Sequence, residues 1–375
     1  MSQSRYEERQ ARTVDCIRDA DLDGILLEDT EGRRCSSIRY LTGLPQDGLL
    51  FIFRTGRTVL VPWDIIMAEK MASASNIIPL TSFERKIDKA ILGVLEAEGL
   101  GTGAKLELPA RTPYPMFNKL CEQMPDILFS CPEKGVEYRI MAMRACKDRD
   151  ETRIIKQAAD ITNTVLDQLE NKFIKGALTT ELDAAMFIAQ AGRKLGAESM
   201  GFETIAAGPE RSFGIHAFPS FSEGPIGTTG LSIIDFGFCF EGYTSDVTMT
   251  VARGPLTDTQ EQMISLVQQA YDAAVEASGP GSNIRGVCGI VDTIFEAAGF
   301  AMPHSLGHGV GLDAHEAPMV STRAEEDAIL EPGMVITIEP GLYSRDDGGV
   351  RLENDLLITE DGAETLTRSR ILRLR

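Results

Sequence analysis

The first third of the chain alternates short apolar runs with segments of helical periodicity. The apolar runs predict strands at residues 24–27, 49–53, 58–61, 76–80 and 104–108. The amphipathic segments between them predict helices at residues 64–74, 82–98 and 114–123. Strands that alternate with helices in this way are typical of an α/β layer with a mixed sheet. No glycine-rich phosphate loop opens these helices, and the region carries no catalytic motif.

The pattern changes near residue 150. A charged stretch at 144–153 precedes an amphipathic helix whose first turn carries Asp150 and Glu151, acidic residues that favour a helix start. Further helices are predicted at 179–195 and 257–277, and strands at 202–206, 231–240, 243–252, 333–338 and 349–359. Helices combined with antiparallel hairpins indicate an α+β fold. We therefore expect an amino-terminal domain at 1–135, a linker at 136–148 and a second domain at 149–375.

Length and charge narrow the class of protein. A chain of 375 residues with 43% hydrophobic and 25% charged residues fits two globular domains, each with its own core. The charge balance is acidic, because 37 Lys and Arg against 56 Asp and Glu leave a formal net charge of −19. A surface of this charge repels phosphate backbones and anionic membranes. We therefore expect neither a nucleic-acid nor a membrane partner.

The sequence also predicts a compartment. The apolar run at 49–53 is far shorter than the roughly 20 residues of a membrane-spanning helix, and residues 1–10 carry charges where a secretory signal would be apolar. The seven cysteines are an odd number without a C-x-x-C pair, which indicates free thiols under reducing conditions. We therefore expect a cytoplasmic protein.

Histidines are few and clustered. All four lie in the second half, and His304, His308 and His315 share one short window, while His216 stands apart. A lone histidine is more often a core or surface residue than a ligand, but the clustering favours a functional site. Glycines on both sides of His308 allow the backbone to approach whatever the imidazole binds. No Lys-Ser/Thr follows these glycines, so a phosphate loop is not indicated.

Two aspartates mark a predicted hairpin. Asp235 lies in the apolar strand 231–238, where an unpaired carboxylate is costly to bury, although a hydrogen-bonded structural role remains an alternative. If residues 241–242 form a two-residue turn, Asp235 lies diagonal to Asp246, with Cβ atoms roughly 7–8 Å apart. Two carboxylates at that separation reach a pair of cations about 3.5–4 Å apart. A longer turn would change this register.

Two glutamates also lie among apolar strand residues. Taken singly, Glu339 and Glu353 are more often salt-bridge partners, with Arg351 as the mate of one carboxylate. Taken jointly with the residues above, they complete a set of four carboxylates and one imidazole: Asp235, Asp246, His308, Glu339 and Glu353. Such an oxygen-rich set suits two divalent ions such as Mn²⁺, Fe²⁺, Co²⁺ or Zn²⁺, and its lack of cysteine fits a catalytic site.

The order of these residues resembles the pita-bread metallopeptidases, which include methionine aminopeptidases, Xaa-Pro aminopeptidases and Xaa-Pro dipeptidases (prolidases). The matching motifs are Asp235 and Asp246, Gly307-His308-Gly309-Val310-Gly311, His315-Glu316-Ala317-Pro318, Glu339-Pro340-Gly341 and Arg351-Leu352-Glu353-Asn354-Asp355. The segment Ile38-Arg39-Tyr40-Leu41-Thr42-Gly43 resembles the creatinase-type amino-terminal domain of the Xaa-Pro branch. The resemblance implies an α+β chain, with a carboxy-terminal pita-bread catalytic domain after a smaller α/β domain.

The resemblance also implies roles for the metal-binding set. Asp246 and Glu353 would bridge two divalent ions, with manganese favoured over cobalt, iron or zinc. Asp235 would hold one ion, while His308 and Glu339 hold the other. A water bridging the metals would attack the scissile carbonyl, with Glu339 as proton shuttle.

Further roles follow from the same resemblance. His216 matches the histidine near the scissile nitrogen, and His315 matches the one that stabilises the tetrahedral oxyanion. His304 would line the substrate pocket, while Arg351 and Tyr343 would orient a metal-bound carboxylate. The family further implies a homodimer acting on short proline-containing peptides.

Two positions depart from the family pattern. Met249 stands where an arginine is common after the second aspartate, and Met319 stands where some prolidases place an arginine that holds the dipeptide carboxylate. A free carboxylate needs a cationic or multiply hydrogen-bonded receptor. Arg323 or Arg345 are the alternative cations, and the preferred peptide length stays open.

Three functions are compatible with these features. The leading hypothesis is a cytoplasmic dinuclear metallohydrolase that cleaves Xaa-Pro bonds as an aminopeptidase or dipeptidase. An alternative keeps the fold and metals but hydrolyses a non-peptide amide or amidine in small-molecule catabolism, because fold alone does not fix the substrate. A third, a binding module on an inactive peptidase fold, is disfavoured because all five ligands are present.

Overall fold

The computed structural model describes residues 3–374, and the chain divides into two compact units between Arg144 and Ala145. The segment expected as a linker contains helix α6. The elements of the first unit, in chain order, are α1 (Gln3–Asp19), β1 (Gly24–Asp29), α2 (Ser36–Thr42), β2 (Gly48–Phe53), β3 (Thr58–Pro62), α3 (Ile65–Met71), β4 (Asn76–Ile77), the 3₁₀ helix η1 (Leu80–Phe83), α4 (Ile87–Ala97), β5 (Lys105–Glu107), α5 (Tyr114–Gln123), β6 (Leu128–Ser130) and α6 (Val136–Ala145).

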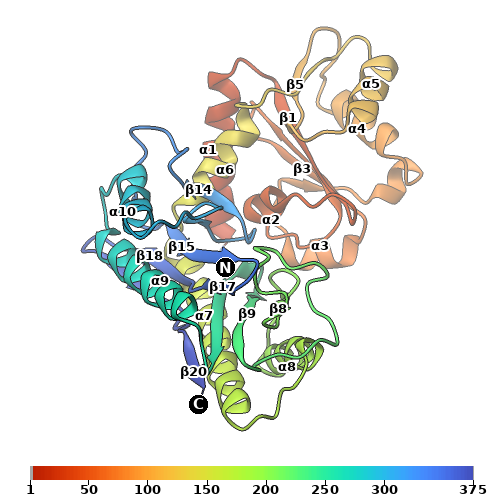
Figure 1. Cartoon of the computed structure of the whole chain (residues 1–375). Helices are drawn as coiled ribbons and strands as arrows, with labels where there is room; N and C mark the ends of the chain where they lie inside the picture. The colour runs from red at the N-terminus through yellow and green to blue at the C-terminus, as the bar shows by residue number, and fades with distance from the viewer. Residues whose placement is uncertain (1–2, 375) are drawn as a thin grey trace. The chain divides into compact units, whose positions relative to one another are not determined.

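The first unit is built on a six-stranded mixed sheet in the order β4-β3-β2-β1-β5-β6. Strands β1, β2 and β3 pair antiparallel, whereas β5 joins β1, and β6 joins β5, in parallel. Every residue of β2 is buried, so both faces of the sheet must be covered. Figure 1 shows α1 on one face and α4 and α5 on the other. The mixed α/β layer predicted from the sequence is confirmed.

Two predicted elements in this unit have different bounds in the structure. The strand predicted at 76–80 stops at Ile77, shortly before Pro79, which has no N–H to donate to a sheet. The helix predicted at 82–98 begins only at Ile87, because residues 80–83 form η1. Helix α1 was not predicted, since its residues are polar around most of the helix.

The second unit combines helices with antiparallel sheets. Its elements are α7 (Arg149–Ile174), α8 (Glu181–Lys194), β7 (Ser199–Met200), β8 (Ile205–Ala207), β9 (Gly230–Phe236), β10 (Phe238–Phe240), β11 (Tyr243–Thr244), β12 (Val247–Arg253), α9 (Asp258–Ala277), α10 (Ile284–Ala297), β13 (Gly307–Gly309), β14 (Glu316–Val320), β15 (Val335–Ile338), β16 (Gly341–Ser344), β17 (Gly348–Arg351), β18 (Asn354–Ile358), β19 (Ala363–Thr365) and β20 (Leu372–Leu374).

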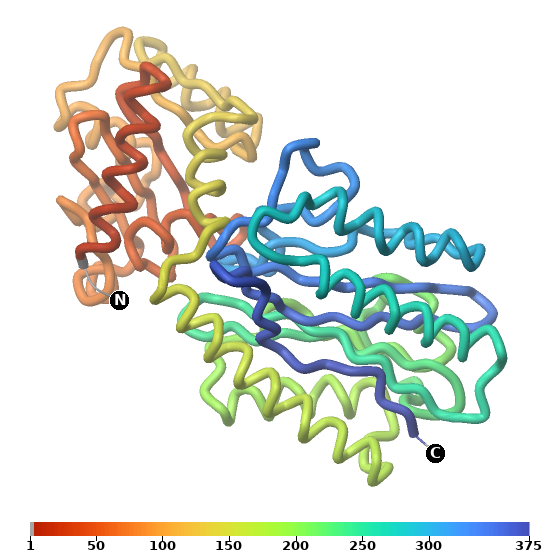
Figure 2. The backbone as a smooth tube through the Cα atoms, turned by 90° about the vertical axis from the view of Figure 1, so that its left-hand side faces the viewer, coloured from red at the N-terminus to blue at the C-terminus, as the bar shows by residue number. Residues whose placement is uncertain are grey.

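Two larger sheets carry this unit, in the orders β20-β12-β9-β8 and β14-β13-β15-β18-β19. An isolated bridge between Thr248 and Glu353 joins them. Helices α7 and α8 cover one side of the strands and α9 and α10 the other, as Figure 2 shows in yellow-green and cyan. The long helix α7 begins at a capping box, in which Asp148 accepts from Glu151 N and Glu151 accepts from Asp148 N.

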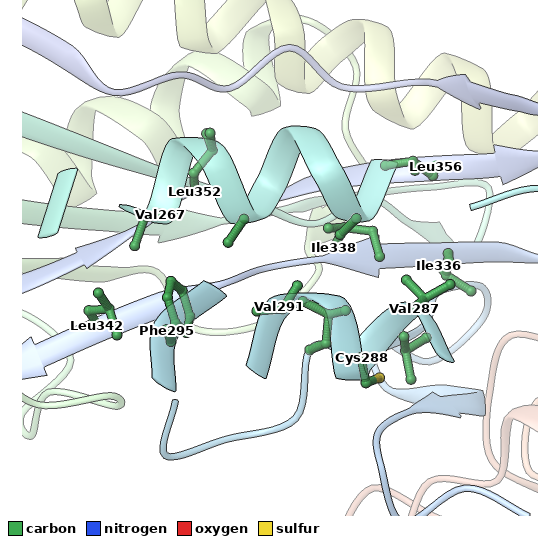
Figure 3. Close-up of a cluster of buried hydrophobic side chains, with 14 of the residues drawn as sticks. Val267, Val287, Cys288, Val291, Phe295, Ile336, Ile338, Leu342, Leu352 and Leu356 are labelled. Atoms are coloured by element: carbon green, nitrogen blue, oxygen red, sulfur yellow. The ribbon is translucent and has the colours of Figure 1, made fainter. Parts of the chain in front are cut away.

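The core beneath α9 and α10 supports the strands that carry the predicted ligands. Figure 3 shows Val267 of α9 and Val291 and Phe295 of α10 facing Ile338 and Leu352 from the strand layer. All five side chains are at most 1% exposed. The apolar contacts of Ile338 and Leu352 therefore fix the backbone next to Glu339, which follows β15, and next to Glu353, which lies between β17 and β18.

Among the described residues, no helix combines the length and the apolar character needed to cross a membrane.

Candidate metal centre

A two-residue turn sets the register of the hairpin that carries both aspartates. Phe240 faces Tyr243 across the turn. Glu241 and Gly242 have φ values of 47° and 90°, which is the backbone that a tight hairpin with the twist of its strands requires. The predicted turn and its pairing are confirmed.

The same register continues beyond the turn. Asp235 pairs with Thr248, two residues past Asp246, so the two aspartates share a face and lie diagonal to each other. Asp235 is 8% and Asp246 3% exposed. A Cβ on Gly237 would lie 1.7 Å from Ser245 O, so only glycine allows the strands to approach between the two acids.

The second sheet supplies the remaining candidate ligands. His308 lies in the centre of β13, Glu339 directly follows β15, and Glu353 lies between β17 and β18. A Cβ on Gly307 would lie 2.0 Å from Thr337 O and one on Gly309 2.1 Å from Ala317 O. The close approach of the neighbouring strands therefore requires glycine on both sides of His308.

Ligand atoms from the two sheets converge on one point. A carboxylate oxygen of Asp246, one of Glu353 and a ring nitrogen of His308 lie within 4.8 Å of one another. His308 Nε2 is 3.8 Å from Asp246 Oδ2 and 3.6 Å from Glu339 Oε1. Three of the predicted carboxylate ligands, Asp246, Glu339 and Glu353, thus surround the imidazole of His308.

The fifth predicted ligand, Asp235, lies outside that group. Arg351 Nη2 donates to its Oδ2 at 2.6 Å, so Asp235 is the carboxylate that this arginine pairs with. Its Oδ1 is buried and has no hydrogen-bond partner among the described residues. A buried carboxylate oxygen in that state needs a cation or a proton.

The electrostatics of the centre likewise favour a cation or a proton. Burial, then the charges of Glu353 and Asp235, raises the pKa of Asp246 well above its ordinary value. Burial and Asp235 raise the pKa of Glu353 to about 7, against the opposing effect of Arg351. Burial and Glu353 raise the pKa of Glu339 well above its usual range. Adjacent buried carboxylates cannot all ionise unaided, so the donor set fits divalent cations.

Arg351 organises the acids from behind. The guanidinium is 2% exposed, and its Nε donates to Thr248 Oγ1 at 2.9 Å while Nη1 donates to Tyr343 Oη at 2.7 Å. Thr248 Oγ1 in turn donates to Glu353 Oε2 at 2.6 Å. One arginine thereby fixes Asp235 directly and Glu353 through a threonine.

His304 belongs to the same network. Its Nε2 is 3.0 Å from Tyr343 Oη and its Nδ1 is 3.9 Å from Glu339 Oε2. Burial lowers the pKa of His304 to about 4 and raises that of Tyr343 to about 12. A Cβ on Gly341 would lie 2.6 Å from the Tyr343 hydroxyl, so glycine leaves the phenol room between arginine and imidazole.

The other two histidines lie at the rim. The rings of His308 and His315 are 4.0 Å apart between centroids, and burial lowers the pKa of His308 to about 3. His315 and His216 are exposed. Burial raises the pKa of Asp235, and the charge of Arg351 lowers it. The charges of His216 and His315 lower the same pKa to a smaller extent. All four histidines of the chain therefore gather at one site.

Some functional contacts were not predicted from the sequence. Asp355 Oδ2 accepts from Asp246 N at 2.9 Å, while its Oδ1 is buried without a partner in the described chain. Lys147 Nζ lies 2.9 Å from Glu316 Oε1, next to His315, with both side chains almost fully buried. For Asp355, the available sequence signal was its position in an apolar run, two residues after Glu353.

Met249 and Met319, which the resemblance sets at arginine positions, have different surroundings. Met249 pairs with Ile234 and is buried in the apolar core beside α7 and α8. Met319 pairs with His308 across β13 and β14 and is 55% exposed. Arg323 and Arg345, the alternative cations, are both exposed.

The fold and site together define a metal-dependent hydrolase, because Asp246, Glu353 and His308 from two sheets converge within 4.8 Å, with Glu339 beside the imidazole. Residues 153–360 match the model of metallopeptidase family M24, and the chain belongs to that family. This confirms the sequence-based resemblance and the enzyme class, and membership implies the use of divalent metal.

Relatives and solved structures cover both units. The Xaa-Pro dipeptidase of Pyrococcus horikoshii is 29% identical over 96% of this chain and 97% of its own length, and that of Pyrococcus furiosus is 32% identical over 80% and 82%. The prolidase structure from Pyrococcus horikoshii OT3 superposes with a TM-score of 0.84 at 28% identity, over 97% of this chain and 99% of that one. The Xaa-Pro dipeptidase structure from Bacillus anthracis gives 0.85 at 27% identity, over 98% and 100%. The predicted pita-bread fold with its amino-terminal domain is confirmed.

Proposed function

We propose that this metallopeptidase cleaves Xaa-Pro peptide bonds. The observation that carries the proposal is the convergence of Asp246, His308 and Glu353 within 4.8 Å in a chain that aligns with Xaa-Pro dipeptidases over nearly its whole length. The substrate is a short peptide with proline on the carboxyl side of the scissile bond.

We propose two divalent ions held by Asp235, Asp246, His308, Glu339 and Glu353. The orphaned Oδ1 of Asp235 and the surplus of buried negative charge support this set. An oxygen-rich set with a single imidazole favours Mn²⁺, with Co²⁺, Fe²⁺ and Zn²⁺ as the alternatives. When bound, the ions supply an activated water and polarise the scissile carbonyl.

The chain's own side chains position the substrate and move the proton. Glu339 takes the proton of the attacking water on a carboxylate oxygen and passes it toward the leaving nitrogen. His315 stabilises the developing oxyanion, and His216 binds near the scissile nitrogen. His304 lines the pocket, held by its contact with Tyr343.

Assembly and compartment are part of the same proposal. We propose a homodimer, as the family resemblance implies, and a cytoplasmic location. None of the seven cysteines, all within the described residues, forms a disulfide, which supports a reducing compartment.

The experiment compares hydrolysis of Gly-Pro, a tripeptide Xaa-Pro-Xaa and creatine by metal-stripped protein with and without Mn²⁺. We expect cleavage of at least one peptide only with metal, and the preferred length then assigns the protein as dipeptidase or aminopeptidase. The Asp246→Asn variant should be inactive, whereas Asp361→Asn, an exposed loop change of equal charge, should match the parent. No cleavage of either peptide with two metals bound would refute the proposal, and turnover of creatine would favour the non-peptide alternative.

A further inference from the structure

The amino-terminal unit contains a cavity separate from the metal ligands. It lies where the parallel strands β1 and β5 end, the edge at which open α/β sheets bind ligands. Its walls are apolar at Leu26, Leu108 and Met116. The loop after β5 and the start of α6 add the charged side chains of Arg111 and Glu137.

The size of the cavity limits the ligand to a few atoms. It offers about 30 Å³ to the centres of water-sized molecules, room for roughly two or three waters. With its open mouth included, the space is about 400 Å³. Two or three waters occupy roughly 60–90 Å³ of liquid, so the interior has the size of a small amino acid.

Two opposite charges line the cavity without pairing with each other. Arg111 forms no hydrogen bond or ion pair with any residue from 3 to 374. Glu137 is 6% exposed, and its Oε2 accepts from Ala110 N at 3.2 Å. Burial raises the pKa of Glu137, while the charge of Arg111 opposes that shift. Each group therefore has capacity left for a ligand.

The other charged side chains of the cavity already have partners. Arg33 is paired with Glu28. Arg34 Nη1 lies 2.6 Å from Asp47 Oδ1 and 3.4 Å from Asp29 Oδ1. The polar recognition available to a ligand is thus one guanidinium and one carboxyl group.

We propose that this cavity binds a small zwitterion, a free amino acid, with its carboxylate on Arg111 and its ammonium group on Glu137. Arg111 donates to the carboxylate and Glu137 accepts from the ammonium group. The apolar walls surround a short side chain. The proposal does not rest on the peptidase function, because every residue it uses lies in the amino-terminal unit.

A ligand-observed NMR titration with L-alanine on the metal-stripped full chain tests this assignment. We expect binding at millimolar concentrations that weakens roughly tenfold or more in Arg111→Gln and in Glu137→Gln, since each variant loses a charge-assisted hydrogen bond. Gln at position 137 still accepts from Ala110 N, so the loop keeps its anchor. Arg12→Gln is the matched control and should bind as the parent does, because Arg12 is an exposed arginine on α1 with no ion pair among residues 3–374.

Acetate and ethylamine separate the two halves of the site. Acetate should depend on Arg111 alone and ethylamine on Glu137 alone. Equal alanine affinity in the parent and Arg111→Gln, or no alanine binding by the parent, would overturn the proposal. Loss in Arg111→Gln without loss in Glu137→Gln would show an anion site and refute the zwitterion. Matching circular dichroism and melting curves for all variants exclude misfolding as the cause.

Discussion

At the scale of single residues, the centre depends on how Arg351 compensates buried acids. Its fork donates to Asp235, Thr248 and Tyr343 at once. A lysine carries the charge but has no planar fork, and cannot reproduce three divergent bonds. Removing one partner of a buried ion pair lowers the free energy of unfolding by far more than the intact pair raises it, because the remaining charge stays buried without a partner.

The Arg351→Met variant should therefore lose about 3–5 kcal/mol of unfolding free energy in metal-free protein, because Asp235 stays buried without its partner. Urea denaturation followed by circular dichroism measures this loss. Arg373→Met removes an exposed pair with Glu261 and should change the free energy by at most about 1 kcal/mol. Equal effects of the two variants would contradict the role given to Arg351.

Thr248 tests the link between the arginine and a proposed metal ligand. Thr248→Val keeps the shape but removes both the acceptor for Arg351 and the donor to Glu353. We expect Mn²⁺ affinity to fall about 10–100-fold, as for other groups that orient ligands, while Thr248→Ser keeps most of it. Calorimetric titration with Mn²⁺ gives both values. Unchanged affinity in the valine variant would remove Thr248 from the network.

At the scale of elements, the sequence predicted those with strong periodicity. Helices α8 and α9 lie close to their expected ranges, because their apolar spacing matches one face of a helix. The strands expected at 231–240 and 243–252 each divide in two, into β9 with β10 and β11 with β12. Helix α10 was not predicted, since Gly286 and Gly289 lower its helix propensity. Strand β13 was not predicted either, because three residues are too few for a periodic signal.

Two glycines on different elements should respond oppositely to alanine. Gly309→Ala places a Cβ 2.1 Å from Ala317 O in β14, which should cost about 1–3 kcal/mol through overpacking. Gly289→Ala adds a Cβ with no neighbour within 4 Å on α10, which should stabilise by about 0.5–1 kcal/mol. Denaturant midpoints compare them. If both variants change stability in the same direction, the close approach of the strands does not explain why residue 309 is glycine.

At the scale of the whole molecule, burial divides the seven thiols. Cys146 is exposed, whereas Cys35, Cys239 and Cys288 are buried. Burial, with nearby carboxylates, raises the pKa of Cys35 and of Cys288 to about 12. A thiol reacts as its thiolate, so these two stay protonated near neutral pH and become reactive only as the pH approaches that value or the chain unfolds.

We expect a disulfide reagent at pH 8 to modify Cys146 rapidly in native protein and the buried three only after denaturation. Mass spectrometry of peptides from both states identifies the modified positions. A Cys146→Ser variant should lose the fast phase and keep the slow one. Fast native modification of Cys288 would show that α10 opens far more readily than its buried core implies.

The sequence by itself determined the two-unit order, the mixed sheet and the Asp235–Asp246 register, and it supplied the candidate ligands. These depend on local physics, because side-chain alternation and a tight turn between adjacent strands leave one pairing that buries the apolar face. Only the tertiary structure decided that His308 approaches Asp246 from another sheet, that Arg351 pairs with Asp235, and that Arg111 and Glu137 share a cavity. Those contacts join residues distant in sequence, and they form only where the packing of two cores balances the entropy of closing long loops.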